Sequence, residues 1–218
     1  MLNILLECQD NLYRQGMKYI LDAVFKVVLN KDLIFSESVD SESVAKADII
    51  VKYMSPGESG LCHQVFQHRK QKSLMIGLYD DDKNPYYAEP PLCFNNIVFI
   101  NCCDPLSEIK KLIERGWDDC QQENTHPDRR SCQNCQSCHY RQLSPQQIRI
   151  AACIYAGEDA AKIARKLNIN IKTVSTHKRM LMAKFNLVSN YELLKFLNLP
   201  KIQAVLPNHS PDLVAGKH

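Results

Sequence analysis

The sequence predicts two domains of different class: an α/β N-terminal domain on a doubly wound parallel sheet, and an all-α C-terminal domain of four helices. In residues 1–116, short apolar runs alternate with stretches of helical periodicity, which is the pattern of a parallel sheet covered on both faces. From Leu143 onward every periodic stretch is helical. The charge divides similarly, since residues 1–119 carry 13 Lys and Arg against 18 Asp and Glu, whereas residues 140–218 carry 12 against 4.

Five apolar runs of strand length predict the sheet of the first domain: Ile4–Leu6, Leu33–Phe35, Asp48–Val51, Leu74–Leu78 and Ile97–Ile100. Helical spacing follows the first, third and fifth of them, over 12–28, 61–66 and 106–114. Gly116 is expected to end the last of these helices as a C-cap. About 116 residues suffice for a five-stranded doubly wound domain.

The remaining chain divides into three segments by composition. Residues 117–142 contain few apolar side chains and predict a cysteine-rich linker. Residues 143–199 predict the helical domain. Residues 200–218 contain three prolines without periodicity, and we expect a flexible tail.

Capping residues divide the second domain into helices. Ser144, followed by Pro145, predicts the start of a first helix that ends at Gly157. Asp159 and Asn170 are suited to cap a second and a third helix, the third running to about Phe185. A fourth helix is expected around three apolar residues, Tyr191, Leu194 and Leu197.

The third helix carries the residues suited to nucleic acid. It is expected to bury Val174, Phe185 and either Met180 or Leu181. The opposite face presents Lys172, Thr173, Ser175, Thr176, Lys178, Arg179 and Lys184. Two short helices joined by three residues, the second basic and rich in hydroxyls, are typical of a helix-turn-helix, in which cations neutralise phosphates and Arg, Ser and Thr reach base edges. A small helical bundle with a merely solvated basic face is the alternative.

Several motifs of this domain resemble the LuxR/NarL (FixJ) helix-turn-helix. They are Leu143-Ser144-Pro145, Ala156-Gly157, Lys162–Ile169, Ile171–Lys178 and Met182–Leu187, and they cover about 60 residues. The stretch Ile171–Lys178 is most similar to the Rcs capsule regulators and their auxiliary relatives. The resemblance therefore favours a DNA-binding domain over a plain bundle.

The resemblance also implies roles for single residues. The third helix would enter the major groove, with Ser175, Thr176 and Arg179 facing bases. Phosphates would be held by Lys172, Thr173 and Lys178. The fourth helix would pair two such domains through Tyr191, Leu194 and Leu197.

Three residues of this domain leave questions open. Gln147 and Arg149 stand where the family has acidic residues in the first helix, which puts a capping interaction or ion pair in doubt. His177 is expected to pack partly against the helix core, as at this position in the family. A pH-sensing or base-contacting role is the alternative for His177.

The first domain resembles the phosphoacceptor receiver that often precedes this helix-turn-helix. The resemblance is carried by Leu5-Leu6, Gly16-Met17, Ser55-Pro56-Gly57 and the order of strands and helices. A receiver needs an acidic pair that binds Mg²⁺ and an aspartate that accepts the phosphoryl group. It also needs a hydroxyl and a lysine beside that aspartate.

When the sequence is aligned on these motifs, none of the required groups stands at its expected position. Cys8 and Gln9 stand at the positions of the acidic pair and Lys52 at that of the phosphoacceptor. Leu78 stands at the hydroxyl position and Asn101 at the lysine position. No Mg²⁺ is expected, because Mg²⁺ requires carboxylate oxygens, and an ammonium group cannot form an acyl phosphate. We therefore expect a pseudo-receiver in which Lys52 pairs with a neighbouring carboxylate, either Glu7 or Asp10.

Four cysteines in and near the linker have the spacing of metal ligands. Cys120, Cys132, Cys135 and Cys138 follow the pattern C-x11-C-x2-C-x2-C, with His126 and His139 nearby. Four of these six side chains would satisfy a tetrahedral zinc ion, and the close C-x2-C-x2-C also suits an iron–sulfur cluster. A thiol redox switch, or a linker without such a function, is the alternative.

These observations predict a phosphorylation-independent, sequence-specific DNA-binding transcription regulator. Its expected partners are double-stranded DNA, RNA polymerase and a second LuxR-type chain, in a homodimer or heterodimer. A metal or redox sensor that acts through protein interaction is the alternative. No nucleophile–base set or phosphate loop indicates an enzyme, and no signal peptide or bilayer-length apolar run is present, so we expect a cytoplasmic protein that does not enter a membrane.

Overall fold

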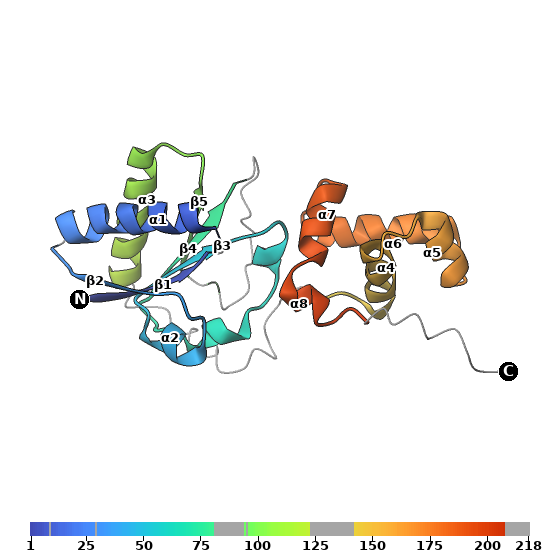
Figure 1. The fold of residues 1–218 in the computed structure, drawn as a ribbon, viewed down its shortest axis with the longest axis horizontal. Coiled ribbons are helices and arrows are strands. Elements are labelled where there is room, and N and C mark those ends of the chain that lie inside the picture. Colours follow the sequence, from blue (N-terminus) through green and yellow to red (C-terminus); the bar gives the residue numbers. More distant parts are fainter. Residues whose placement is uncertain (9, 29, 81–93, 95, 123–141, 208–218) are drawn as a thin grey trace. The chain divides into compact units, whose positions relative to one another are not determined.

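The computed structural model describes residues 1–218 except residues 9, 29, 81–93, 95, 123–141 and 208–218 (Figure 1). The chain divides into two compact units, one built on a sheet and one built from helices. The prediction of an α/β domain followed by an all-α domain is therefore confirmed.

The N-terminal unit contains a five-stranded sheet in which every neighbouring pair is parallel. Its strands are β1 (Leu2–Glu7), β2 (Leu33–Ser36), β3 (Ile49–Tyr53), β4 (Leu74–Tyr79) and β5 (Ile97–Asn101). Their order is β2-β1-β3-β4-β5, so the winding direction reverses between β1 and β3. All five predicted strands are confirmed, and such a reversal is where doubly wound sheets place their functional crevice.

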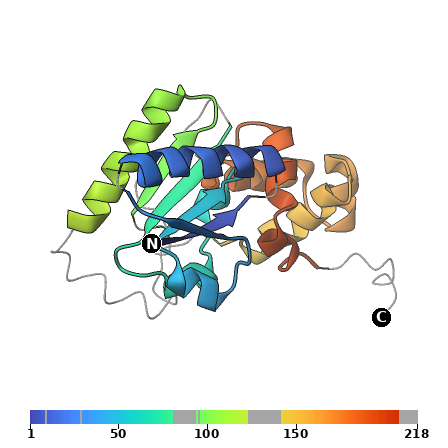
Figure 2. The same ribbon diagram turned by 60° about the vertical axis from the view of Figure 1, so that its left-hand side comes forward.

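Helices cover both faces of this sheet (Figures 1 and 2). One face packs against α1 (Asn11–Leu21), the π-helix η1 (Asp22–Val28) and α3 (Leu106–Gln122). The other face packs against α2 (Ser41–Lys46) and the 3-10 helix η3 (Gln64–His68). A further 3-10 turn, η2 (Glu58–Gly60), lies between β3 and η3. The helix predicted over 61–66 is therefore wrong in type and bounds, because only its last three residues are helical and they belong to the 3-10 helix η3.

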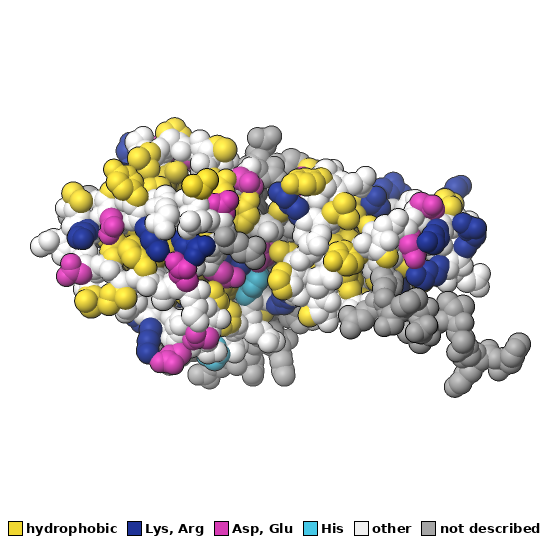
Figure 3. Space-filling model, in the orientation of Figure 1, with side chains coloured by type: hydrophobic (Ala, Val, Ile, Leu, Met, Phe, Trp, Pro, Cys, Tyr) yellow, Lys and Arg dark blue, Asp and Glu magenta, His cyan; other side chains and the backbone are white. Residues whose placement is uncertain are grey.

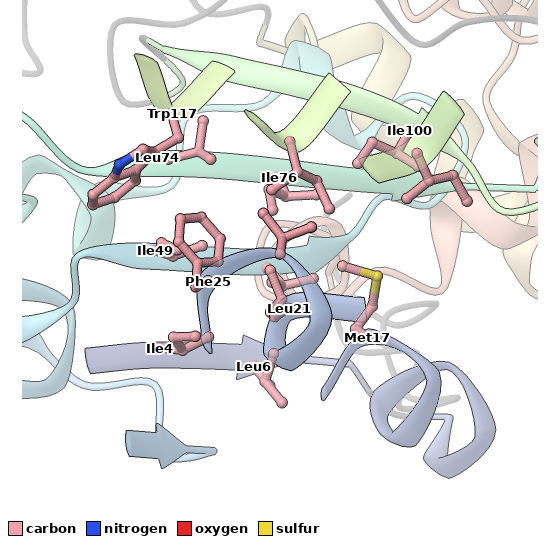
Figure 4. Packing of buried hydrophobic residues seen from close by; sticks show 14 of the residues in the cluster. Ile4, Leu6, Met17, Leu21, Phe25, Ile49, Leu74, Ile76, Ile100 and Trp117 are labelled. Carbon is pink, nitrogen blue, oxygen red and sulfur yellow. The ribbon is translucent and has the colours of Figure 1, made fainter. Parts of the chain in front are cut away.

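The larger core cluster joins the sheet to η1 and α3 (Figure 4). The rings of Phe25 and Trp117 meet edge to face with centroids 5.2 Å apart. Ile49 and Leu74 from β3 and β4 complete this part of the cluster. Strands buried on both faces explain why the sequence of this unit shows continuous apolar runs rather than alternation.

The end predicted for the last helix of this unit is wrong. α3 continues through Gly116 to Gln122, so residues 117–122 of the predicted linker belong to a helix. A Cβ atom at Gly116 would lie 2.4 Å from Cγ2 of Val98 and 3.2 Å from Cδ1 of Leu74. Gly116 is therefore the point of close approach between α3 and the sheet, and not a helix cap.

The C-terminal unit contains α4 (Pro145–Tyr155), α5 (Ala160–Lys166), α6 (Ile171–Lys184), α7 (Asn190–Leu197) and α8 (Pro200–Gln203). The first four of these are the predicted helices. The flexible tail predicted from residue 200 is wrong at its start. Residues 200–203 form α8, and Ile202 and Leu206 are buried. Residues 208–218 lie outside the described part of the chain. None of the helices in the described ranges has the length and apolar character needed to cross a membrane.

Gly116 in α3 and Gly16 in α1 provide a matched test of this packing. We expect Gly116→Ala to lower the free energy of unfolding by about 1–3 kcal/mol, since overpacking against Val98 outweighs the better helix propensity of alanine. Gly16→Ala in α1, where a Cβ meets nothing within 4 Å, should raise it by about 0.5–1 kcal/mol. Urea unfolding followed by the fluorescence of Trp117, the single tryptophan, measures both. Equal effects of the two substitutions would contradict the packing described.

Candidate nucleic-acid interface

A reciprocal capping box fixes the start of α4. The backbone N–H of Gln147 donates to Oγ of Ser144 at 3.3 Å, and the backbone N–H of Ser144 donates to Oε1 of Gln147 at 2.9 Å. The capping interaction is therefore present although Gln147 replaces an acidic residue, because its neutral amide accepts the hydrogen bond that a carboxylate would accept. Gly157, with φ of 75°, follows the end of α4 as predicted.

The connection between α5 and α6 has the caps that the sequence predicts. Oδ1 of Asp159 accepts from the backbone N–H of Lys162 at 2.8 Å and begins α5. Asn168 adopts φ of 50°, a left-handed conformation that asparagine tolerates better than most residues. Oδ1 of Asn170 accepts from the backbone N–H of Lys172 at 2.8 Å and begins α6. Together these caps set a tight turn between the two helices.

Burial separates α6 into an inner and an outer side. Val174, Leu181 and Phe185 are buried, so the open choice between Met180 and Leu181 falls to Leu181. Apart from Ile171 at the first position of the helix, the exposed residues recur at helical spacing and define the outer face: Lys172, Ser175, Thr176, Arg179, Met180 and Ala183. Thr173 and Lys178 lie half-buried at its borders. The structure thus brings the six predicted DNA-contacting residues onto one exposed side of α6 and its flanks.

Hydrogen bonds orient the hydroxyl groups of this face. Oγ of Ser175 donates to the carbonyl of Ile171 at 3.2 Å, and Oγ1 of Thr176 donates to the carbonyl of Lys172 at 2.9 Å. Lys184, which the sequence places on the same face, instead donates to the backbone carbonyl of Gln142. Lys184 therefore holds the segment before α4 against α6.

Further cations lie on α5 and were not among the predicted contacts. Lys162 and Arg165 are exposed there, while Lys166 pairs with Glu158 at 2.8 Å. Figure 3 shows Lys and Arg side chains gathered over α5 and the adjacent part of α6. Their spacing opposite Ile163 and Ala164 could have revealed them, because residues opposite a buried helix stripe face solvent.

His177 lies between the two sides of α6. Its side chain is partly buried, and its Nδ1 atom is buried without a hydrogen-bond partner among the described residues. This position agrees with the expectation that His177 packs partly against the core.

The predicted dimer residues separate on α7. Tyr191 and Leu194 are exposed, and Val188, just before the helix, is exposed beside them in sequence. Leu197 is fully buried and therefore does not belong to the exposed residues of α7. The exposed apolar residues of this region are therefore Val188, Tyr191 and Leu194.

Lys52, which the sequence analysis aligns with the phosphoacceptor of a receiver, forms a largely buried ion pair. Lys52 faces Glu7 across β1 and β3 in the sheet register, and Lys52 Nζ lies 2.7 Å from Glu7 Oε1. The Lys52 side chain is 5% exposed and that of Glu7 is 30% exposed. Of the two candidate partners, the structure selects Glu7, because Asp10 caps α1 by accepting from the backbone N–H of Leu12 at 2.7 Å.

The other side chains that the sequence analysis aligned with a receiver's site are a thiol, an aliphatic chain and an amide. Cys8 and Leu78 are buried, and Oδ1 of Asn101 accepts from the backbone N–H of Cys103 at 2.9 Å. Gln9 lies outside the described residues. Burial, reinforced by the charge of Asp80, raises the pKa of Cys102 to about 11. At neutral pH the thiol of Cys102 is therefore protonated.

The predicted metal ligands do not come together in the described part of the chain. Cys120 is buried on α3, where Nδ2 of Asn96 lies 3.8 Å from its Sγ atom. Cys132, Cys135, Cys138 and the two nearby histidines lie outside the described residues. Among the residues that are described, no group of three or more His, Cys, Asp or Glu side chains could hold a metal ion.

A protein-family model matches the helical unit. Residues 141–197 match the model described as "Bacterial regulatory proteins, luxR family". No curated protein sequence matches the chain.

Several solved structures share the two-unit architecture. The two-component response regulator RcsB in complex with DNA is 16% identical, with a TM-score of 0.52 over 90% of this chain and 97% of that chain. A structure of two RcsB dimers bound to two parallel DNAs is 17% identical, with the same TM-score and the same coverage. RcsB from Salmonella enterica serovar Typhimurium, bound to promoter P1flhDC with the phosphomimetic BeF3−, is 16% identical, with a TM-score of 0.50 over 90% and 97%. At this identity the similarity establishes the fold, a receiver followed by a helix-turn-helix.

The Lys52–Glu7 pair predicts strongly coupled substitutions. Lys52→Met should lower the free energy of unfolding by about 3 kcal/mol, because it leaves the Glu7 carboxylate partly buried and unpaired. Lys52→Met combined with Glu7→Leu should recover most of this loss, since no uncompensated charge remains. A double-mutant cycle in urea measures the coupling. Additive effects would contradict a direct interaction of the two side chains.

Proposed function

Because residues 141–197 are a helix-turn-helix domain of the luxR family, we propose that this chain is a sequence-specific DNA-binding transcription regulator that works without phosphorylation. The observation that carries the proposal is the outer face of α6, where exposed Lys, Ser, Thr and Arg side chains stand opposite a buried apolar side. That arrangement leaves these side chains free to enter a groove of duplex DNA.

We assign roles on α6 by the chemistry of each group. Arg179 can donate two hydrogen bonds to guanine, while Ser175 and Thr176 reach neighbouring base edges. Lys172, Thr173 and Lys178 contact phosphates. The positive end of the α6 dipole adds attraction beside Lys172. Lys162 and Arg165 on α5 supply further phosphate contacts, as the first helix of this motif crosses the DNA backbone.

We propose that the protein binds DNA as a dimer. Tyr191 and Leu194 on α7, together with Val188, expose apolar surface that a second chain would cover. The second chain is either another copy or a receiver-type regulator of the same family, and the dimer would read two half-sites about one helical turn apart. RNA polymerase is the partner that converts DNA binding into control of transcription.

The proposed independence of phosphorylation follows from the ion pair at the phosphoacceptor position. Lys52 offers no carboxylate to a phosphodonor, and its ammonium occupies the place beside Glu7. The Glu7 carboxylate already has a cation as its partner through Oε1. The receiver fold therefore serves as a fixed scaffold or a partner-binding domain.

We further propose that Cys120, Cys132, Cys135 and Cys138, with His126 and His139 nearby, supply the ligands of zinc or of an iron–sulfur cluster. Soft thiolates at this spacing suit both metals. Zinc would order the segment between the two units. An iron–sulfur cluster would make DNA binding respond to redox state.

Substitutions on α6 test DNA recognition. The full chain is first used to select duplexes from a random pool. We expect Arg179→Ala to weaken binding to the best selected sequence by about 1–3 kcal/mol and to relax the base preference at one position. Lys178→Ala should weaken all sequences alike and reduce the slope of log K against log salt by about 1. Lys201→Ala on α8 is the control. Unchanged binding by Arg179→Ala would favour the alternative, a sensor that acts through protein contacts.

Treatment with acetyl phosphate and Mg²⁺ tests the degenerate receiver. We expect no acyl phosphate in the intact mass spectrum and no change in affinity for the selected duplex, because position 52 carries an ammonium group. A hydroxylamine-sensitive phosphoryl adduct on the N-terminal unit would refute the proposal.

Metal content tests the cysteine segment. The protein purified without oxygen should contain either zinc or iron with sulfide, and Cys135→Ser should lose it. The exposed thiol of Cys103 provides the control, since Cys103→Ser should retain the metal. Absence of both metals from the wild-type protein would overturn this assignment.

A further inference from the structure

The outer face of α6 contains an apolar strip within its polar surroundings. Met180 is 55% exposed, although the adjacent Leu181 is buried. Thr176, Met180 and Ala183 follow one another at intervals of four and three residues, so their side chains are neighbours on one side of the helix. All three are exposed.

Hydrogen bonding gives Thr176 its apolar character. Its Oγ1 donates to the carbonyl of Lys172 at 2.9 Å, which turns the hydroxyl toward the helix backbone. The hydroxyl hydrogen is thereby engaged, although its oxygen can still accept, and the γ-methyl group adds an apolar part to the exposed surface of Thr176. The strip therefore consists of the Thr176 methyl, the flexible Met180 thioether chain and the Ala183 methyl, beside the cations of Lys172 and Arg179.

An isolated exposed methionine is common on protein surfaces and needs no function. Met180 differs from that case in two respects. It belongs to a strip with Thr176 and Ala183. This strip lies on the outer face of α6, opposite the buried side of the helix. Apolar groups at this place face the only apolar group that a base pair presents in the major groove, the 5-methyl group of thymine.

We propose that Met180, with the Thr176 methyl and Ala183, determines specificity by contacting the 5-methyl group of a thymine close to the base read by Arg179. This inference rests on the proposed DNA-binding function. It adds a residue and a base preference that the charged and hydroxyl groups of α6 do not provide. Methionine suits this role because its unbranched, polarizable chain adapts to irregular apolar surfaces.

Deoxyuridine provides the test, since it differs from thymidine in its base only by the missing 5-methyl group. The full chain is used to select duplexes from a random pool, and each thymine of the selected sequence is then replaced singly by deoxyuridine. For the wild-type protein we expect one replacement in each half-site to weaken binding about fourfold, the value of one buried methyl-sized group. The replacement should have no effect on Met180→Ala.

A second variant and a control separate specificity from folding. Thr176→Ser keeps the hydroxyl and removes the methyl, so it should reduce the discrimination between thymine and uracil in part. Val205→Ala removes an equally exposed apolar side chain outside α6 and should discriminate like the wild type. Circular dichroism establishes that each variant is folded.

The outcomes distinguish the inference from the proposed function. If the wild type selects a defined sequence but shows the same deoxyuridine response as Met180→Ala, the role of Met180 is refuted while DNA recognition stands. If the wild type selects no sequence, the proposed function itself fails. Loss of the deoxyuridine response in Met180→Ala, with its retention in Val205→Ala, supports the assignment.

Discussion

Burial of Val174, Leu181 and Phe185 decides what the opposite side of α6 can do. An α-helix packed along one stripe has its rotation about its own axis fixed, so each outward residue acquires a defined direction. The caps at Asp159 and Asn170 fix where α5 and α6 begin, and the left-handed Asn168 fixes the turn between them. Every proposed contact with DNA depends on this packing, because a slip of one residue would bring Met180 into the core and Leu181 to the surface.

The N-terminal unit depends on a different constraint, the parallel register of β1 and β3. Because Glu7 and Lys52 are partners across these strands, their side chains meet where the winding of the sheet reverses. In doubly wound sheets this crevice is where a ligand or a phosphoryl group is placed. Here a charge of each sign lies at this point, and Cys8 at the end of β1 and Leu78 on β4 are buried. The unit keeps the architecture of a receiver, with an ion pair between the two strands at which the winding reverses.

The sequence predicted most of the architecture because its strands are buried on both faces and its helices begin at strong caps. The sequence could not predict the end of α3, because it does not distinguish a glycine at a close contact between helix and sheet from a glycine at a helix cap. The spacing of Cys120 also did not show that its side chain lies on the buried side of α3. Likewise, periodicity could not separate Met180 from Leu181 or show that Leu197 lies inside, as adjacent apolar residues fit a helix stripe equally well.

The register of Glu7 and Lys52 also restricts how this protein could change over evolutionary time. Introducing an aspartate at position 52 by itself would set two carboxylates directly opposite each other on neighbouring strands, where like charges destabilise the sheet. It would also remove the cation that now compensates Glu7. A carboxylate at this position would therefore require position 52 and its partner on β1 to change together, because each single change would be destabilising. The fold itself thus opposes a stepwise introduction of a carboxylate at position 52.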